Sequence, residues 1–200
     1  MQHDACRLND ADETPAVCDR WLDTTFDRMG DLVEETNASA IVTSSRQPRP
    51  GTPFDESTSS FASAYESLGS HGVPLAVIAP VPEGNVVGLD CPSLLFDGLR
   101  ECAIDRSVGL AHAPPILAAV NEAGAELIEM TQFFCNTSTC PAVIDDIWVR
   151  RDSHHISRTY SAALSEALEA EIAKVLPELF DAPGPAVAPG ALAFEQSQGQ

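Results

Sequence analysis

Residues 113–130, APPILAAVNEAGAELIEM, contain the two elements that decide the fold class of this chain. Two prolines stand where a helix begins and Gly124 stands where one ends, which predicts a helix over 113–124. A short apolar run at 126–130 follows at once and predicts a strand. Because helices and strands that alternate are typical of α/β proteins, the chain is predicted to belong to that class.

Two further strands are predicted upstream of this unit. SAIVTS at 39–44 and VPLAVIAPVP at 73–82 are short and apolar, as expected of strands buried on both faces of a sheet. The stretch TSSRQPRPGTP after the first strand is a loop by composition. Residues 56–70 are predicted to form a helix because their large apolar side chains have helical spacing: Phe61, Tyr65 and Leu68.

Helices are also predicted near both ends of the chain. Residues 16–35 carry a stripe expected to pack in the core: Trp21, Phe26, Met29, Leu32 and Val33. Residues 142–149, AVIDDIWV, indicate a fourth strand. A last helix is predicted over 159–176, with Ser157 as its N-cap and Pro177 at its end. The buried face of that helix is predicted to hold five residues: Tyr160, Leu164, Leu168, Ile172 and Val175.

This alternation predicts one domain over residues 1–180, built as a three-layer α/β/α, doubly wound parallel sheet. The Pro/Gly/Ala-rich residues 181–200 are expected to form a disordered tail. In such folds the chemistry gathers beyond the carboxyl ends of the strands. Two segments fit that location, TSSRQ at 43–47 and RRDSHHIS at 150–157.

The charge of the chain excludes some partners. There are 30 acidic against 11 basic residues, a formal net charge of −19, and a single lysine, Lys174. Nucleic acids and anionic membrane surfaces are therefore not expected partners, because both require clusters of Lys and Arg. No apolar run approaches the roughly 18 residues that span a bilayer, and the first residues, MQHDACRLND, lack the features of a signal peptide.

The cysteines point to an oxidising compartment instead of the cytosol. All six fall into pairs that are close in sequence, and their spacing favours three disulfides: Cys6–Cys18, Cys91–Cys102 and Cys135–Cys140. Two alternatives stay open at this point. The six could be unrelated buried thiols, or Cys135 and Cys140 could bind zinc with His154 or His155.

Asp152 and His155 form the most informative pair in the sequence. Two residues separate them, directly before a helix, so one short turn can bring the carboxylate and the imidazole to a common rim. A carboxylate that orients a histidine, which then removes a proton from a nucleophile, is the chemistry of acyl transfer. Surface solvation of a helix-leading turn explains the same residues without catalysis. His154 is one residue too close to Asp152 for this pattern and is expected to face solvent.

The stretch EMTQFFCNTSTCPAVIDDIWVRRDSHHISRTYSAAL, residues 129–164, resembles the end of the SGNH domain that follows type-3 membrane acyltransferases. That domain closes with a Cys-bracketed loop, a Cys-Pro-x-Val-Ile run, an apolar strand, Arg-Asp-x-x-His-Leu-Thr and a final helix. Ile156 and Ser157 replace the usual Leu and Thr. The upstream elements occur in the same order as in that family, so the resemblance covers residues 1 to about 180.

The resemblance implies that His155 is the general base and Asp152 its orienting carboxylate. It also implies a serine nucleophile in a Gly-Asp-Ser motif on the first strand, but no such motif occurs in these 200 residues. The chain is therefore expected to lack that first strand and, alone, to be inactive. The family's Gly-x-Asn-Asp block is also missing, because the matching strand end is TSSRQ. The oxyanion contact is assigned instead to Ser44, Ser45 or Arg46.

The implied function is acyl transfer to, or removal from, a hydroxyl of a cell-surface glycan, without metal or organic cofactor. The implied partners are an acyl donor or acylated glycan and an upstream membrane acyltransferase domain, which places the domain on the extracytoplasmic face of the membrane. Two other functions remain. One is a non-catalytic remnant or glycan-binding module that keeps the fold, and the other is an esterase that uses a serine of its own such as Ser44.

Overall fold

The centre of the molecule is a three-stranded parallel sheet. The computed structural model describes residues 16–48, 53–84, 102–152 and 155–181. Strands β1 (Ile41–Ser44), β2 (Leu75–Ile78) and β4 (Glu126–Ile128) lie in the order β1-β2-β4. Ile41 pairs with Leu75 and Ala76 with Glu126, so the carboxyl ends of all three strands meet at one edge.

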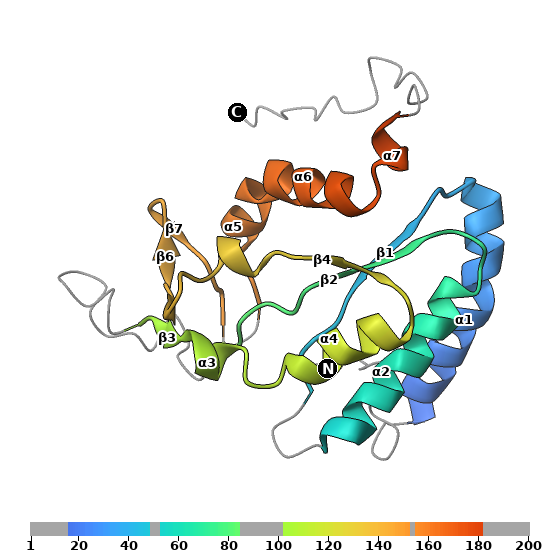
Figure 1. Cartoon of the computed structure of the whole chain (residues 1–200), viewed down its shortest axis with the longest axis horizontal. Coiled ribbons are helices and arrows are strands. Elements are labelled where there is room, and N and C mark those ends of the chain that lie inside the picture. The colour runs from blue at the N-terminus through green and yellow to red at the C-terminus, as the bar shows by residue number, and fades with distance from the viewer. Residues whose placement is uncertain (1–15, 49–52, 85–101, 153–154, 182–200) are drawn as a thin grey trace, which may run out of the picture.

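Helices cover both faces of this sheet (Figure 1). Helices α2 (Phe54–Gly69) and α4 (Pro114–Glu122) lie on one face, and α5 (Arg158–Ala163) and α6 (Ser165–Val175) on the other. Because the strand order follows the chain order, right-handed crossovers place α2 and α4 on the same side. The predicted α/β class, with a parallel sheet flanked by helices, is confirmed.

The side chains of β2 divide the core into two clusters. Leu75 and Val77 point toward α2 and α4, whereas Ala76 and Ile78 point toward α5 and α6. This alternation follows from the two-residue period of a strand. Leu75, Ala76 and Val77 are all buried, which is the pattern expected of a central strand covered on both faces.

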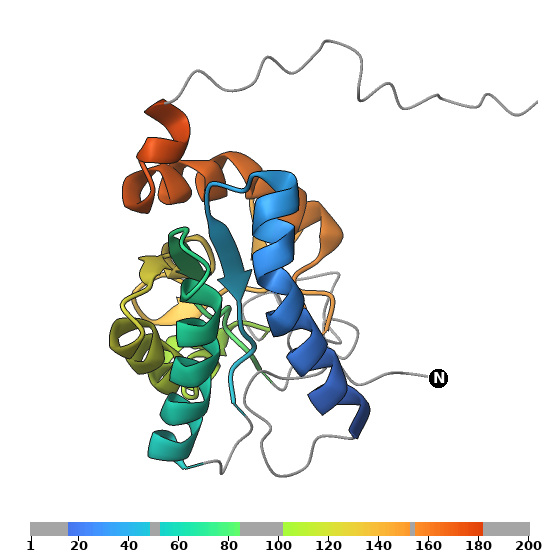
Figure 2. The ribbon, with the colours of Figure 1, turned by 90° about the vertical axis from the view of Figure 1, so that its right-hand side faces the viewer.

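Helix α1 (Ala16–Thr36) runs beside α2 and packs against the same cluster (Figure 2). Phe26, Met29 and Val33 make this contact, but Leu32 is 39% exposed, so its predicted place in the core is wrong. Trp21 belongs to α1, but its side chain lies outside the described part.

The helices over 56–70 and 113–124 were predicted close to their observed bounds, and Phe61, Tyr65 and Leu68 are all buried. The first strand is less buried than predicted. Val42 of β1 is 42% exposed, since among the described strands only β2 pairs with β1 and no described helix covers that side chain.

Residues 142–149 do not form one strand, which corrects the sequence prediction. They fold into a hairpin of β6 (Val143–Ile144) and β7 (Ile147–Trp148), separate from the main sheet. Asp145 and Asp146 occupy the turn with φ angles of 49° and 62°. Two central residues with positive φ are what a tight hairpin turn requires, and Asp tolerates this conformation better than most residues.

The predicted last helix is divided at Leu164 into α5 and α6, and a short α7 (Glu178–Asp181) follows Pro177. Its predicted apolar face packs in the second cluster. The remaining short elements lie near the hairpin: β3 (Ile104–Asp105), α3 (Arg106–Gly109), the 3-10 helix η1 (Thr131–Phe133) and β5 (Thr139–Cys140). The tail predicted over 181–200 lies outside the described residues, except Asp181.

Candidate active site

The segment that leaves β1 is held in place by Gln47. This side chain is 2% exposed, and its Nε2 donates to the carbonyl oxygens of Val81 at 2.9 Å and Gly109 at 2.8 Å. Its Oε1 accepts the backbone N–H of His112 at 3.0 Å. One side chain therefore joins three chain segments at the carboxyl edge of the sheet. Sequence reasoning missed Gln47, because its partners lie 34 to 65 residues away and leave no local signal.

Ser45 is fixed by a helix on one face of the sheet. The hydroxyl of Tyr65, in α2, donates to Oγ of Ser45 at 2.8 Å. Burial raises the pKa of Tyr65 to about 12, an effect that the hydrogen bond to Ser45 partly opposes. The neutral phenol is thus the form that the fold favours, and it holds Ser45 as an acceptor.

The turn with Asp152 and His155 is shaped by a short antiparallel bridge between Arg150 and Ile156. The N–H of Arg151 donates to the carbonyl of His155 at 2.9 Å, next to this bridge. The N–H of His155 in turn donates to Oδ1 of Asp152 at 2.8 Å. These bonds bring the two side chains together before α5, whose N-cap is Ser157 as predicted.

Asp152 and His155 also contact each other through their side chains. Nδ1 of His155 lies 2.8 Å from Oδ2 and 2.9 Å from Oδ1 of Asp152. The carboxylate is 27% exposed and the imidazole 56%, so the pair sits at the surface with its ring open to solvent. A carboxylate at Nδ1 favours the tautomer with its proton there, which leaves Nε2 as the nitrogen able to accept a proton.

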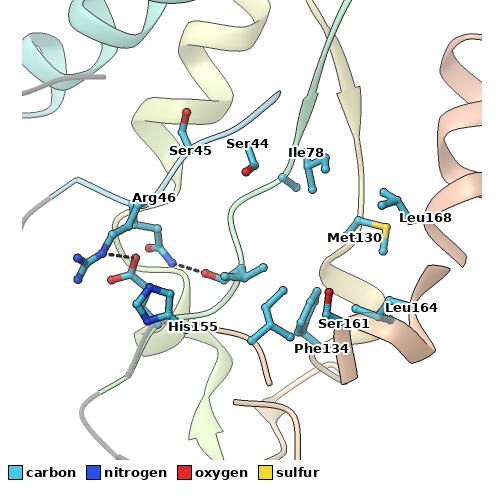
Figure 3. Close-up of a pocket in the computed structure, with 15 residues that line it drawn as sticks. Ser44, Ser45, Arg46, Ile78, Met130, Phe134, His155, Ser161, Leu164 and Leu168 are labelled. Carbon is cyan, nitrogen blue, oxygen red and sulfur yellow. Dashed lines mark hydrogen bonds and ion pairs between the residues drawn. The ribbon is translucent and has the colours of Figure 1, made fainter. Parts of the chain in front are cut away.

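A pocket of about 400 Å³ brings the two predicted segments together (Figure 3). His155 lines it from one segment, and Ser44, Ser45 and Arg46 line it from the other. Sequence reasoning did not find Glu83, which also lines the pocket and whose Oε1 lies 3.3 Å from Nε of Arg46. Glu83 follows β2, so its position after a strand was the available signal.

Ser44 and Ser45, two of the three serines that line the pocket, are not arranged as nucleophiles for His155. They lie together at the end of β1, apart from the imidazole, and the hydroxyl of Ser45 points away from it (Figure 3). The third, Ser161, lies beside Leu164, also apart from the imidazole. The arrangement therefore supplies a base and its orienting carboxylate, with further polar groups in the lining of the same pocket.

The cysteine loop starts directly after Phe134, which lines this pocket. Cys135 and Cys140 form a disulfide, so they are not thiolate ligands and the zinc alternative for these cysteines is excluded. Asn136 shapes the loop between them, because its Oδ1 accepts the N–H groups of Ser138 at 2.9 Å and Thr139 at 2.7 Å. Cys102 is also disulfide-bonded. The predicted pairs Cys6–Cys18 and Cys91–Cys102 involve side chains outside the described part of the structure.

The fold and the site together define a three-layer α/β domain with a carboxylate–histidine pair at the carboxyl edge of its sheet. The family described as SGNH domain (fused to AT3 domains) matches residues 1–170, and the chain belongs to that family. Hydrolase-like or acyltransferase-like chemistry is the function that this membership supports, with an acyltransferase domain as the associated domain. No curated protein matches the chain.

The family membership also indicates a domain of a membrane protein. Within the ranges that the structure describes, no helix has the length and apolar character needed to cross a bilayer.

Proposed function

We propose that this domain transfers an acyl group to, or removes it from, a hydroxyl of a cell-surface glycan. The observation that carries the proposal is the contact between the Asp152 carboxylate and Nδ1 of His155, whose ring lines a pocket. In this proposal Asp152 orients the ring and His155 is the general base. Family membership supports the reaction class.

The reaction proceeds through an acyl-serine. Nε2 of His155 takes the proton of a serine hydroxyl while the serine oxygen bonds to the ester carbonyl carbon. The bond to the leaving alcohol then breaks, and the alcohol takes that proton from His155. A sugar hydroxyl or water reverses the sequence, losing its proton to His155 as it attacks the acyl-serine. The 200 residues contain no Gly-Asp-Ser motif, so in this proposal the serine comes from outside them.

Negative charge develops on the carbonyl oxygen of the ester during each attack, and hydrogen-bond donors stabilise it. Ser44, Ser45 and Arg46 are the candidates, since all three line the pocket that His155 lines. Because Ser45 accepts a hydrogen bond from Tyr65, its own proton remains able to donate elsewhere. Arg46 offers a positive charge, which its ion pair with Glu83 holds at the pocket.

In this proposal the associated acyltransferase domain supplies the acyl group. The SGNH domain lies on the extracytoplasmic side of the membrane. The disulfide of Cys135 and Cys140 supports this placement, because such bonds persist in oxidising compartments. The same side of the membrane carries the glycan whose hydroxyl accepts the acyl group.

A glycan-binding module without catalysis is the second candidate. One observation favours it, the lack of Gly-Asp-Ser in this sequence. The two candidates differ in what the Asp152–His155 pair does: in the module it would only hold the turn before α5.

The test compares the 200 residues alone with the protein extended by the segment that its gene encodes upstream, including any Gly-Asp-Ser. Turnover of an aryl acetate is measured for both, with and without His155→Ala. Activity in the extended protein alone, lost on His155→Ala, is the expected result. If the 200 residues alone turned over the ester as fast as the extended protein, the nucleophile would lie within them and Ser44 would be the next candidate. Glycan binding without turnover in either protein would favour the second candidate.

A further inference from the structure

The interior of the pocket beside His155 is apolar. Its walls come from the carboxyl end of β2, the chain that follows β4, the turn after His155, and α6 with its junction to α5. They are formed by Ile78, Met130, Phe134, Ile156, Leu164 and Leu168. Apart from Ser161, the polar lining residues belong to β1, the segments that follow β1 and β2, and the His155 turn.

The polar and apolar parts of the pocket lie on different sides of it. Figure 3 shows His155 and Arg46 on one side, with Met130, Leu164 and Leu168 across the pocket from them. A ligand that satisfies both sides has a polar, ester-like end and an apolar tail. The base and the candidate oxyanion donors thus lie at the reacting end of such a ligand.

The pocket is larger than an acetyl group requires. An acetyl group has about the bulk of two water molecules, roughly 60 Å³ at ~30 Å³ each. In a pocket of about 400 Å³ it would leave most apolar side chains in contact with water. A chain of about eight carbons, at roughly the same bulk per carbon, fills more than half of this volume.

We propose that this pocket binds the acyl chain of the ester, and that the site prefers medium-length acyl groups over acetyl. The proposal rests on the proposed function, because it takes His155 as the reacting end of the site. The carboxylic acid released by hydrolysis has the same tail and a carboxylate that suits Arg46. Binding of that product tests the pocket without any need for a nucleophile.

The experiment measures binding of octanoate and of acetate to the folded 200-residue chain by titration calorimetry, below the concentration at which octanoate forms micelles. Octanoate is expected to bind at least about 100-fold more tightly, since each buried methylene contributes about fourfold. Leu168→Trp, which fills the apolar end, should weaken octanoate binding at least tenfold. Leu117→Trp is the matched control, because Leu117 lies in α4 on the other face of the sheet and is 38% exposed.

Unfolding curves of both variants show whether the fold is kept. Equal affinity for the two acids, binding of neither, or unchanged octanoate binding by a folded Leu168→Trp would each overturn the inference. Turnover of aryl octanoate and aryl acetate by the extended protein separates the two proposals. If turnover of aryl acetate depends on His155 and aryl octanoate is not preferred, the acyl-chain inference alone is wrong. If octanoate binds but no turnover depends on His155, the proposed function is wrong and the pocket is a fatty-acid binding site.

Discussion

Asp152 holds His155 through two different groups, since its carboxylate accepts the backbone N–H of His155 at 2.8 Å and contacts the ring Nδ1 at 2.8 Å. The backbone bond fixes the turn, and the side-chain contact fixes the ring. A single carboxylate therefore sets both the position and the tautomer of the imidazole. This double contact is what makes the pair suitable as a positioned base.

Removing the imidazole should strongly lower turnover in the extended protein. His155→Ala is expected to lower kcat for an aryl ester by on the order of 10²–10⁴, because general base catalysis contributes that much. Asp152→Asn should lower kcat with little change in KM, since it alters the tautomer and not the pocket. His154→Ala is the matched control and should keep most of the activity. A larger loss from His154→Ala than from His155→Ala would show that the motif register is wrong.

Gln47→Glu should destabilise the fold although it keeps the shape of the side chain. A carboxylate cannot donate to the carbonyls of Val81 and Gly109, so two buried acceptors lose their donor and face a negative charge. The expected loss is about 2–3 kcal/mol in the free energy of unfolding, measured in urea. Arg46→Gln, at an exposed neighbouring position, should change stability by less than about 0.5 kcal/mol. Equal stability of Gln47→Glu and the wild type would show that this side chain does not hold the β1 end.

The stability of the domain should fall in alkali because of Tyr65. Its pKa is raised from 10.0 to about 12 in the folded state, so the unfolded chain loses the phenol proton first. The contribution is fully present below pH 10 and is lost as the pH rises through 12, by about 2–3 kcal/mol in total. Tyr65→Phe should remove this part of the pH dependence. Parallel urea midpoints for both proteins from pH 9 to about pH 12 would contradict the assignment.

The Cys135–Cys140 bond should contribute about 2 kcal/mol, because it closes a short loop and the chain-entropy model gives that value for short loops. The double variant Cys135→Ser, Cys140→Ser is expected to unfold at correspondingly lower urea. Peptide mapping without reductant also tests the pairs Cys6–Cys18 and Cys91–Cys102. Free thiols, or bonds between the three pairs, would argue against the proposed extracytoplasmic location.

Ser157 should matter as a helix cap. Its Oγ accepts the N–H of Tyr160 at 3.1 Å and its hydroxyl donates to the carbonyl of Trp148. Ser157→Ala is expected to cost about 1 kcal/mol of unfolding free energy. Ser157→Thr keeps the hydroxyl and should stay close to wild type. If both variants were equally stable, the cap would contribute nothing measurable.

Much of the fold could be predicted from short segments. The helical spacing of Phe61, Tyr65 and Leu68 and the proline and glycine positions around 113–124 locate two helices correctly, because these signals act within a few residues. Residues 142–149 were mistaken for one strand, since the turn at Asp145 and Asp146 depends on backbone angles that Asp tolerates but does not require.

The sequence by itself determined the α/β class, the cap at Ser157 and the closeness of Asp152 to His155, because each depends on neighbours in the chain. Only the tertiary structure decided that Arg46 faces the same pocket as His155, that Gln47 joins three segments, and that the pocket interior is apolar. These relationships join residues up to about a hundred positions apart. They arise when parallel strands bring their carboxyl ends to one edge of the sheet. No local pattern in the sequence shows which distant segments will meet there.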